Sequence, residues 1–426
     1  MTVWGVKVLS QGDVKKKKRW CMALIVQKYG GSSVANPERI KRVAKRIIAS
    51  KGRGGEVVVV VSALGDTTDR LIELAHRITG EPAEREMDVL ISTGEQVSVA
   101  LLAMAIQALG SQAISFTGPQ VGIVTDSSHT QARILRINTK KIKEALRKGK
   151  IVIVAGFQGA DVNANITTLG RGGSDLTAVA LAVALKAKGC EIYTDVEGVY
   201  SADPRIDPRA RKLVSISYDE MLEMASAGAR VLHNRAVEFA KRFDIPIQVR
   251  SSFSGGEGTV VTKERKGMEN IVVRGVTLNM DEAKVSLRGV PDKPGVAAKI
   301  FKTVANENIN IDMIIQNIGE EGKSDISFTV LKRDLKRTLA ITGKIAKAIG
   351  AGRVDSDERI ARVSIVGVGM RTHSGIAARM FGALAARKIN IEMISTSEIK
   401  ISCIVDKKHG EKAVRAIHAK FGLGKR

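Results

Sequence analysis

The chain reads Met22-Ala-Leu-Ile-Val-Gln-Lys28-Tyr-Gly30-Gly31-Ser-Ser-Val34 where its first regular structure is expected. Residues 24–27 predict a strand, and the two glycines after it predict a tight turn. A helix should follow from about Pro37 to Lys51, because apolar residues recur at helical spacing between Ile40 and Ile47. This strand–turn–helix unit predicts the start of an α/β domain.

The same alternation continues to about residue 250. Val57–Val61 and Ile151–Ala155 are continuous apolar runs, typical of parallel strands that are covered on both faces. Glu191–Tyr193 reads the same way, and single helices are expected over Asp175–Lys188 and Tyr218–Phe243. Residues 22–250 therefore predict a layered α/β domain with a mainly parallel sheet.

Residues 1–21 stand apart from this pattern. Met22 has the form of an initiator, so we interpret 1–21 as an N-terminal extension that is disordered or not native. The basic cluster Lys15–Arg19 precedes a short apolar stretch without a small-residue cleavage site, so it does not predict a signal peptide. The apolar runs are shorter than the roughly 18 residues of a membrane span. Three scattered cysteines argue for a reducing compartment, and we expect the cytoplasm.

The C-terminal part contains an internal repeat. A linker-like stretch, residues 251–269, separates it from the first domain. Three blocks beyond the linker then recur in the same order: Ala283–Val290 as Ala361–Val368, Gly295–Phe301 as Gly375–Phe381, and Ile309–Ile314 as Ile389–Ile394. Each copy reads strand, helix, strand, strand and helix. We therefore predict two tandem βαββαβ units, at 270–349 and 350–426.

A second glycine-rich turn, Thr167–Asp175, precedes the helix predicted to end at Lys188. Glycine lets the backbone approach a phosphate, and a helix N-terminus favours negative charge. Neither turn is a Walker loop or a dinucleotide fingerprint, and each alone is compatible with an ordinary tight turn. Because the two turns together carry Lys28, Arg171 and Asp175, the pair indicates a phosphoryl-transfer site.

The chain has a net charge of +24, which is compatible with an acidic partner such as nucleic acid. Only 4% of its residues are aromatic, however, so the stacking platforms of single-strand binders are scarce. We favour a solvated basic surface together with a site for a polyanionic nucleotide.

Five stretches resemble the signature motifs of aspartate kinases within the amino-acid kinase family. They are Lys28–Val34, Val60–Asp69, Ser92–Glu95, Thr168–Asp175 and Tyr193–Arg205. The duplicated C-terminal unit resembles the paired ACT domains with which these enzymes sense amino acids. The resemblance runs from Met22 to about Gly424.

This resemblance implies an activity and its partners. The γ-phosphoryl of ATP would pass to the β-carboxylate of L-aspartate and give 4-phospho-L-aspartate, at the first step of lysine, threonine and methionine biosynthesis. Mg²⁺ is implied because the phosphates need charge neutralisation, although the sequence predicts no metal-ligand cluster of its own. The effector would be lysine, threonine or both. A homo-oligomer or α2β2 assembly through the ACT units is implied, and neither a membrane nor nucleic acid is expected as a partner.

The resemblance also implies roles for individual residues. Lys28 would contact the phosphoryl oxygens, helped by backbone N–H groups of Gly30, Gly31 and the helix starting near Ser174, and Asp175 would hold Lys28 by an ion pair. Arg171 would bind the substrate α-carboxylate, Glu95 its ammonium group, and Ser62 and Thr68 the substrate or phosphate. The predicted ATP-binding residues are Lys28, Gly30, Gly31, Ser62, Gly173, Thr194, Asp195, Tyr200, Arg205 and Arg230. The predicted substrate-binding residues are Ser62, Thr68, Glu95, Arg171 and Ser174.

Structural alternatives remain open for several of these residues. Asp175 is also compatible with a helix N-cap, and Glu95 with a first-turn acid that complements a helix dipole. Asp203-Pro204 and Asp207-Pro208 are compatible with plain turns. For His233 we predict packing or exposure rather than a catalytic role.

Each repeat offers a helix N-terminus for an effector carboxylate and an acid for its ammonium group. The predicted effector-binding residues are Asp292, Gly295, Asn310, Asp312, Gln316, Gly375, Ile376, Asn390 and Glu392. The sequence departs from the family pattern at Arg230, where a lysine is usual, and at His373-Ser374-Gly375, where His-Pro-Gly is usual. Met268 is a hypothetical internal start of a separate regulatory subunit.

Two other classes of protein are alternatives to an aspartate kinase. A kinase for acetylglutamate, glutamate or UMP would share the core fold but does not predict the Lys28–Ser33 opening together with two ACT repeats. A non-enzymatic amino-acid sensor or a nucleic-acid binder would leave Lys28, Arg171 and Asp175 unexplained.

Overall fold

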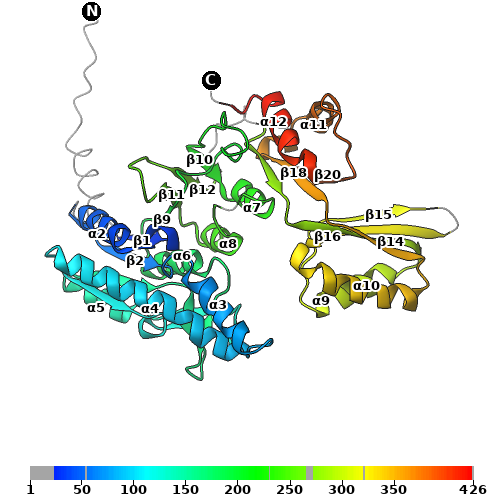
Figure 1. Cartoon of the computed structure of the whole chain (residues 1–426). Helices are drawn as coiled ribbons and strands as arrows, with labels where there is room; N and C mark the ends of the chain where they lie inside the picture. The colour runs from blue at the N-terminus through cyan, green and yellow to red at the C-terminus, as the bar shows by residue number, and fades with distance from the viewer. Residues whose placement is uncertain (1–23, 53–54, 230, 265–271, 320–321, 425–426) are drawn as a thin grey trace, which may run out of the picture. The chain divides into compact units, whose positions relative to one another are not determined.

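A computed structural model describes residues 24–52, 55–229, 231–264, 272–319 and 322–424 (Figure 1). These residues form two compact units. The first unit runs to Val199 and adds Lys212–Leu222 and the described residues from 231 to 264. The second unit takes Tyr200–Arg211, Glu223–Ala229 and the described residues from 272 onward. The predicted extension 1–21 and the proposed start at Met268 lie outside the described residues.

An eight-stranded sheet forms the centre of the first unit, in the order β10-β12-β11-β9-β1-β2-β6-β3. All its neighbouring strands are parallel except the β11–β12 pair, which confirms the predicted α/β fold with a mainly parallel sheet. The strands are β1 (Ile25–Tyr29), β2 (Val57–Val61), β3 (Ala113–Phe116), β6 (Ile151–Ala155), β9 (Cys190–Thr194), β10 (Ser215–Ser217), β11 (Ile247–Ser251) and β12 (Thr259–Thr262).

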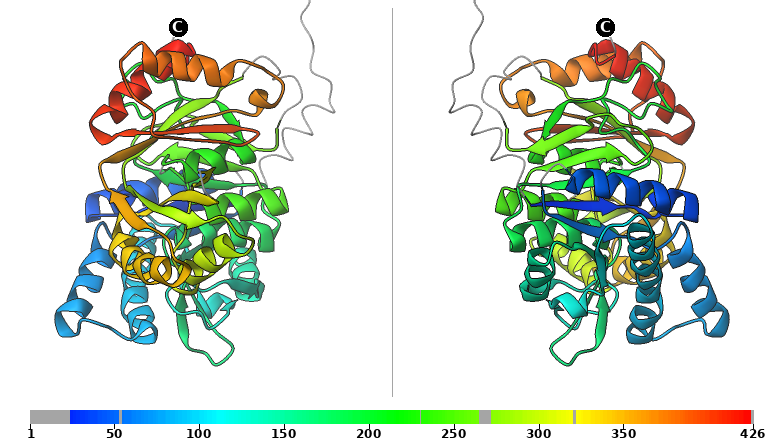
Figure 2. Two further views of the ribbon diagram at one scale, coloured as in Figure 1. Left: turned by 90° about the vertical axis from the view of Figure 1, so that its right-hand side faces the viewer. Right: turned by 90° about the vertical axis from the view of Figure 1, so that its left-hand side faces the viewer.

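Helices cover the two faces of this sheet. On one face, α2 (Pro37–Lys51) and α4 (Glu84–Ala108) bury Ile47 and Leu102 against the strands. Figure 2 shows α2, in blue, running beside β1. On the other face, α6 (Gly173–Leu185) packs on β1 and β2 and against α8 (Asn234–Phe243). Two further helices of this unit are α3 (Thr67–Ile78), beside α4, and α5 (Lys140–Arg147), beside β6.

A second, smaller sheet leads into the glycine-rich turn before α6. It has the order β5-β4-β7-β8 and is formed by β4 (Ile123–Thr125), β5 (Ile134–Ile137), β7 (Gln158–Ala160) and β8 (Ile166–Thr168). The sequence pattern did not indicate this sheet, because strands of three or four residues carry too little periodicity.

Two further features differ from the sequence-based expectation. The single helix expected over Tyr218–Phe243 is wrong: α7 (Tyr218–Ser226) and α8 are separate helices. Gly228, at φ +115°, adopts a backbone conformation that does not continue a helix. Strand β12 lies inside the expected linker 251–269 and pairs with β11, so the sheet extends past residue 250.

The second unit contains two four-stranded antiparallel sheets, each with two helices. One sheet has the order β15-β16-β14-β17 and the other β13-β18-β20-β19. The first repeat provides β14 (Glu282–Pro291), α9 (Val296–Asn306), β15 (Ile314–Ile318), β16 (Lys323–Leu331), α10 (Leu335–Ile349) and β17 (Arg353–Asp357). The second provides β18 (Ile360–Val366), α11 (Ile376–Ala385), β19 (Met393–Thr396), β20 (Lys400–Asp406) and α12 (Gly410–Lys420).

The repeats are interleaved rather than strictly tandem. Strand β13 (Gly275–Asn279) precedes the first repeat but pairs with β18 of the second. Strand β17 lies beyond residue 349 but pairs with β14 of the first. A division at residue 349/350 therefore does not follow the sheets, because the first repeat is inserted between β13 and the remainder of the second.

Among the described helices, α4 alone is long and apolar enough to cross a membrane. Half of its most apolar window is buried inside the protein. The helix also carries the buried acids Asp88 and Glu95, whose carboxylates accept hydrogen bonds from neighbouring loops. We interpret α4 as a core helix.

Candidate active site

Lys28 and Asp175 form an ion pair on the α6 face of the large sheet. Lys28 lies near the end of β1, and Asp175 in the first turn of α6. The Lys28 Nζ lies 2.6 Å from the Asp175 Oδ1, and both side chains are almost completely buried. The predicted pairing is confirmed. The helix N-cap is Gly172, so Asp175 is not the cap.

The first glycine turn follows Lys28 closely. A Cβ atom on Gly30 would lie 3.5 Å from the Lys28 Nζ, so the turn passes beside the ammonium group. A Cβ on Gly31 would lie 2.8 Å from the Ala63 carbonyl oxygen, which excludes a larger residue without a backbone shift. The first glycine turn is thus packed directly against the loop that follows β2.

Two expectations for this turn need correction. It leads into a short 3₁₀ turn, Gly31–Ser33, and α2 begins only at Pro37 with Asn36 as its cap. The Gly30 N–H is donated to the Tyr193 carbonyl at 3.2 Å, so it is not available to a phosphate in this structure. Of the two predicted glycine donors, only the N–H of Gly31 remains a candidate.

The second glycine turn opens α6. Gly172 has φ +74°, and the N–H groups of Gly173 and Leu176 are donated back to Gly170 and Gly172. The N–H groups of Ser174 and Asp175 then stand at the open end of the helix, where the helix dipole favours an anion. A Cβ on Gly156 would lie 2.7 Å from the Ser174 Oγ, so Ser174 is held closely against the end of β6.

Glu95 lies in the middle of α4 and points into the same region. It is therefore not a first-turn acid, and that alternative is wrong. Its Oε1 accepts the Ala63 N–H at 3.1 Å, while its buried Oε2 has no hydrogen-bond partner among the described residues. Burial raises the pKa of Glu95 to about 7, against the opposing effect of the Ala63 N–H and the nearby Lys28 cation. A buried carboxylate oxygen without a partner is suited to bind a cationic group.

The other predicted substrate residues lie after β2, at the start of α3 and in the second glycine turn. Ser62 lies at the end of β2, and its N–H is donated to the Tyr29 carbonyl at 3.1 Å. Thr68 is in the first turn of α3. Arg171 is exposed on the second glycine turn, and no ion pair of its guanidinium occurs among the described residues. The site thus combines an unpaired guanidinium with a buried carboxylate, the two charges that recognise an amino acid.

The predicted nucleotide residues are divided between the two units. Thr194 ends β9, and its hydroxyl donates to the neighbouring Asp195 carboxylate at 2.9 Å. Tyr200 and Arg205 belong to the second unit, where Arg205 is 90% exposed and pairs with Asp203 at 2.7 Å. The Asp203 carboxylate also accepts the Arg205 N–H, so Asp203-Pro204 does form the turn that was the structural alternative. Arg230 lies outside the described residues.

Two residues near the site were missed by sequence reasoning. Asp88, buried in α4, accepts hydrogen bonds from the Thr168 hydroxyl at 2.5 Å and from the Thr130 N–H. Arg235, in the first turn of α8, donates to the Leu169 carbonyl. Both hold the segment that leads to Arg171. The spacing of Asp88 and Glu95, two helical turns apart on an apolar helix, was a usable signal for Asp88.

The predicted effector residues lie in several different environments. Asp292, Gly295 and Gln316 line one cavity of about 460 Å³ at the start of α9. The acids of both repeats are instead engaged by cations, since Asp312 pairs with Arg362 and Glu392 pairs with Lys284. Asn310 and Asn390 are exposed. At the start of α11, Gly375 is the N-cap and Ile376 is buried in the core.

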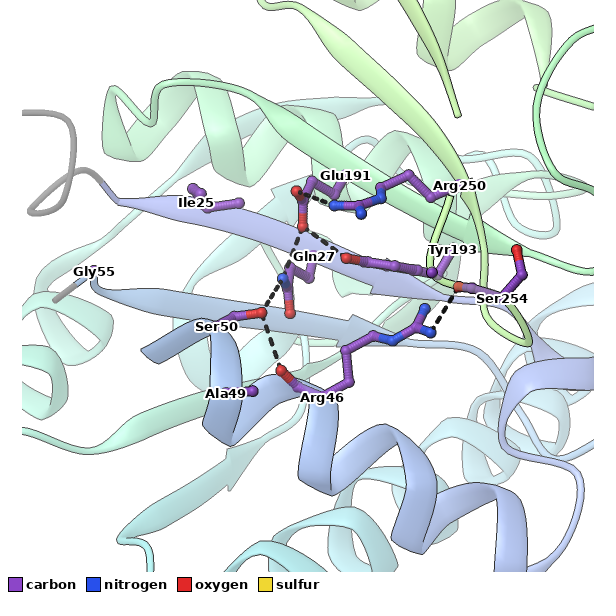
Figure 3. A pocket seen from close by; sticks show the side chains of 11 residues that line it. Ile25, Gln27, Arg46, Ala49, Ser50, Gly55, Glu191, Tyr193, Arg250 and Ser254 are labelled. Carbon is purple, nitrogen blue, oxygen red and sulfur yellow. Dashed lines mark hydrogen bonds and ion pairs between the residues drawn. The ribbon is translucent and has the colours of Figure 1, made fainter. Parts of the chain in front are cut away.

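A second cavity, of about 360 Å³, lies on the α2 face of the large sheet (Figure 3). Gln27, the neighbour of Lys28 on the opposite face of β1, donates to Glu191 at 2.8 Å. Arg250 pairs with the same Glu191, and Arg46 donates to the Ser251 and Ser254 carbonyls. These charges are satisfied within the protein, so we interpret the group as a tether for the loop after β11.

Models of two known protein families match the two parts of the chain. The model of the amino acid kinase family matches residues 23–251, and ACT-domain models match 285–350 and 363–421. The chain is 54% identical over 404 residues to an aspartokinase of Pseudomonas aeruginosa, covering 94% of this chain and 98% of that protein. It is 52% identical over 404 residues to an aspartokinase of Helicobacter pylori, covering 94% and 99%.

Solved structures extend the similarity. An aspartate kinase from Synechocystis is 46% identical with a TM-score of 0.54, covering 95% of this chain and 70% of that chain. E. coli aspartokinase III in complex with aspartate and ADP is 26% identical with a TM-score of 0.79, covering 93% and 99%. The chain belongs to the amino-acid kinase family, and within it to the aspartate kinases that carry paired ACT domains.

Proposed function

We propose that the chain transfers the γ-phosphoryl of ATP to the β-carboxylate of L-aspartate and forms 4-phospho-L-aspartate. The observation that carries this proposal is the buried Lys28–Asp175 pair next to Glu95, whose inward oxygen lacks a partner among the described residues. Family membership supports the same reaction, because relatives at about half identity over nearly the whole chain are aspartate kinases.

The acceptor needs no general base. An aspartate side chain has a pKa near 4 and is already ionised at neutral pH, so it can attack the phosphorus directly. The barrier is the repulsion between this carboxylate and the triphosphate. Lys28 and the open N–H groups at the start of α6 supply positive charge at that point, and Asp175 fixes the Lys28 ammonium in place. Catalysis then rests on positioning and electrostatic stabilisation.

Substrate recognition follows from the remaining charges. Glu95 would bind the α-ammonium group through its free oxygen, and Arg171 the α-carboxylate through its planar guanidinium. Ser62 and Thr68 would donate hydrogen bonds to the substrate or the phosphate. With both α-groups held, the length of the side chain decides whether its carboxylate reaches the phosphorus, which favours aspartate over glutamate.

The nucleotide would enter as its Mg²⁺ complex. Among the described residues there is no cluster of three acidic, histidine or cysteine side chains that could hold a metal ion. Mg²⁺ in nucleotide enzymes is commonly bound mainly by phosphate oxygens and water, with one or two carboxylates. Thr194 and Asp195, in the first unit, are the described candidates for nucleotide contacts; the nucleotide roles of Tyr200 and Arg205 stay predictions from the family resemblance.

We propose further that an amino acid inhibits the enzyme through the ACT units. The cavity lined by Asp292, Gly295 and Gln316 is large enough for an amino acid and lies at the N-terminus of α9, which favours a carboxylate. E. coli aspartokinase III has been crystallised with lysine and aspartate in a T-state. By analogy we assign lysine, threonine or both as effectors, an oligomer formed through the ACT units, and a cytoplasmic enzyme of lysine, threonine and methionine biosynthesis.

A hydroxamate assay tests the activity. Purified enzyme with MgATP and hydroxylamine is expected to give aspartyl hydroxamate from L-aspartate, and much less product from glutamate or acetylglutamate. Product from none of the three, or a preference for another acceptor, would contradict the proposal. Omission of Mg²⁺ with added chelator should abolish the product.

A further inference from the structure

Arg235 supports the loop that carries Arg171. Its guanidinium donates to the Leu169 carbonyl at 2.5 Å and to the Ala132 carbonyl at 2.9 Å. The Ala132 N–H is itself donated to the Thr168 carbonyl, so these two chain segments are already joined. Arg235 therefore fixes both segments immediately before Gly170, where the second glycine turn begins.

His233 contacts the same turn at Gly172. A Cβ on Gly172 would lie 2.3 Å from the Cβ and Cγ of His233, so the backbone of the turn rests directly on this side chain. The His233 Nδ1 is buried and has no hydrogen-bond partner among the described residues. Burial lowers the pKa of His233; Asp175 opposes this shift, and Arg235 and Arg171 reinforce it. The ring is thus neutral at pH 7 and acts by its shape.

The other end of α8 provides a contrast. Lys241 is about half exposed and pairs with the half-exposed Asp219, which is not part of the glycine turn. An arginine that serves only to solubilise the helix would resemble Lys241. Arg235 instead directs two donors at backbone carbonyls, which is the arrangement of a residue that fixes a loop.

We propose that Arg235 and His233 are positioning residues, which hold the Gly170–Gly173 turn so that Arg171 meets the α-carboxylate of the substrate. This inference rests on the proposed function. It assigns no chemistry to either side chain. It predicts that their loss weakens binding of the amino acid much more than binding of the nucleotide.

Steady-state kinetics of full-length variants test the proposal. Arg235→Met is expected to raise KM for aspartate at least tenfold, with less than a twofold change in KM for MgATP and a smaller fall in kcat. Arg235→Lys should recover part of the loss, because an ammonium group reaches one carbonyl but cannot bridge two. His233→Ala should shift KM for aspartate in the same direction by a few-fold. Lys241→Met, on the same helix, should leave both constants unchanged.

The outcomes separate the two proposals. Wild-type enzyme without aspartate-dependent turnover would remove the proposed function. Active wild-type enzyme together with a folded Arg235→Met variant of unchanged KM for aspartate would overturn the inference. Equal losses for both substrates would show a merely structural role and overturn it as well. If Arg235→Met does not fold, Arg235→Lys and His233→Ala decide by the same comparison of KM values.

Discussion

Arg362, on the first strand of the second repeat, forms an ion pair with Asp312 of the first repeat. A second pair, between Lys284 of the first repeat and Glu392 of the second, mirrors it. Lys284 and Arg362 are equivalent positions in the duplicated sequence, and so are Asp312 and Glu392. The two repeats are thus joined by reciprocal ion pairs.

The two cations differ strongly in burial. Arg362 is 1% exposed, and it also binds the buried Glu282 at 2.7 Å and the Ser226 carbonyl at 2.8 Å. Lys284 and Glu392 are each more than a fifth exposed. Because both acids already have cationic partners, an effector ammonium group would have to displace them. This favours the cavity at α9 as the effector site.

Arg362→Met is expected to destabilise the protein by about 3–5 kcal/mol, because it leaves Glu282 buried without its cation. Lys284→Met, at the equivalent position of the first repeat, should cost about 1 kcal/mol or less, since its pair is accessible to water. Urea unfolding of both variants measures the difference. Equal costs would show that burial does not distinguish the two pairs.

Lys28→Ala is expected to lower kcat by about a thousandfold or more, since a cation that stabilises the charge on a transferring phosphoryl group is commonly worth that much. Asp175→Asn should lower kcat less, because the ammonium group remains but loses its fixed position. Circular dichroism should show an unchanged fold in both variants. Substantial residual turnover in Lys28→Ala would remove the electrostatic account of the reaction.

Glu95 should make aspartate binding depend on pH. Burial raises its pKa to about 7, and the free oxygen must be ionised to bind an ammonium group. KM for aspartate is therefore expected to rise as the pH falls below 7, while KM for MgATP changes less. Parallel pH dependence of the two constants would contradict this assignment.

The same shift predicts an effect on stability. Between the ordinary pKa of a glutamate and about 7, the folded protein binds more protons at Glu95 than the unfolded chain, so stability falls as the pH rises through this range. Glu95→Gln removes the buried charge. It should raise the unfolding temperature at pH 8, have little effect near pH 5, and lower activity at least about a hundredfold. A loss of stability at pH 8 would argue that the carboxylate is not strained by burial.

Local patterns predicted the regular elements well where burial is continuous. The apolar runs Val57–Val61 and Ile151–Ala155 are strands with those bounds, and α2 spans Pro37–Lys51 as expected. The exchange of β13 and β17 between the repeats was not predictable, because a strand pattern does not specify its pairing partner. The break at Gly228 was missed for a related reason: a single glycine inside an apolar periodic stretch does not reveal its φ angle.

The candidate site was predicted mainly through family resemblance. Lys28 and Asp175 are far apart in the sequence. They meet because β1 is a parallel strand of the large sheet and α6 packs on it. Arg235 was missed because it binds backbone carbonyls, which no motif encodes, whereas the spacing of Asp88 and Glu95 on an apolar helix was a signal that could have been used. The Glu95 Oε2 without a hydrogen-bond partner among the described residues likewise results from packing, which the sequence alone does not show.

We expect the effector to bind the first repeat, at the cavity that Gln316 lines. Gln316→Leu replaces a polar side chain of the first-repeat cavity with an apolar one of similar size, so it should weaken inhibition by lysine or threonine at least tenfold. Activity without effector should change less than twofold, because Gln316 lies in the second unit and is not one of the residues proposed for substrate or nucleotide binding. Asn390→Leu changes a predicted effector residue of the second repeat and should leave inhibition unchanged. Inhibition curves with each amino acid alone and with both together measure the effect. Loss of inhibition in Asn390→Leu but not in Gln316→Leu would transfer the effector site to the second repeat, since the two variants change equally polar side chains in opposite halves of a duplicated structure.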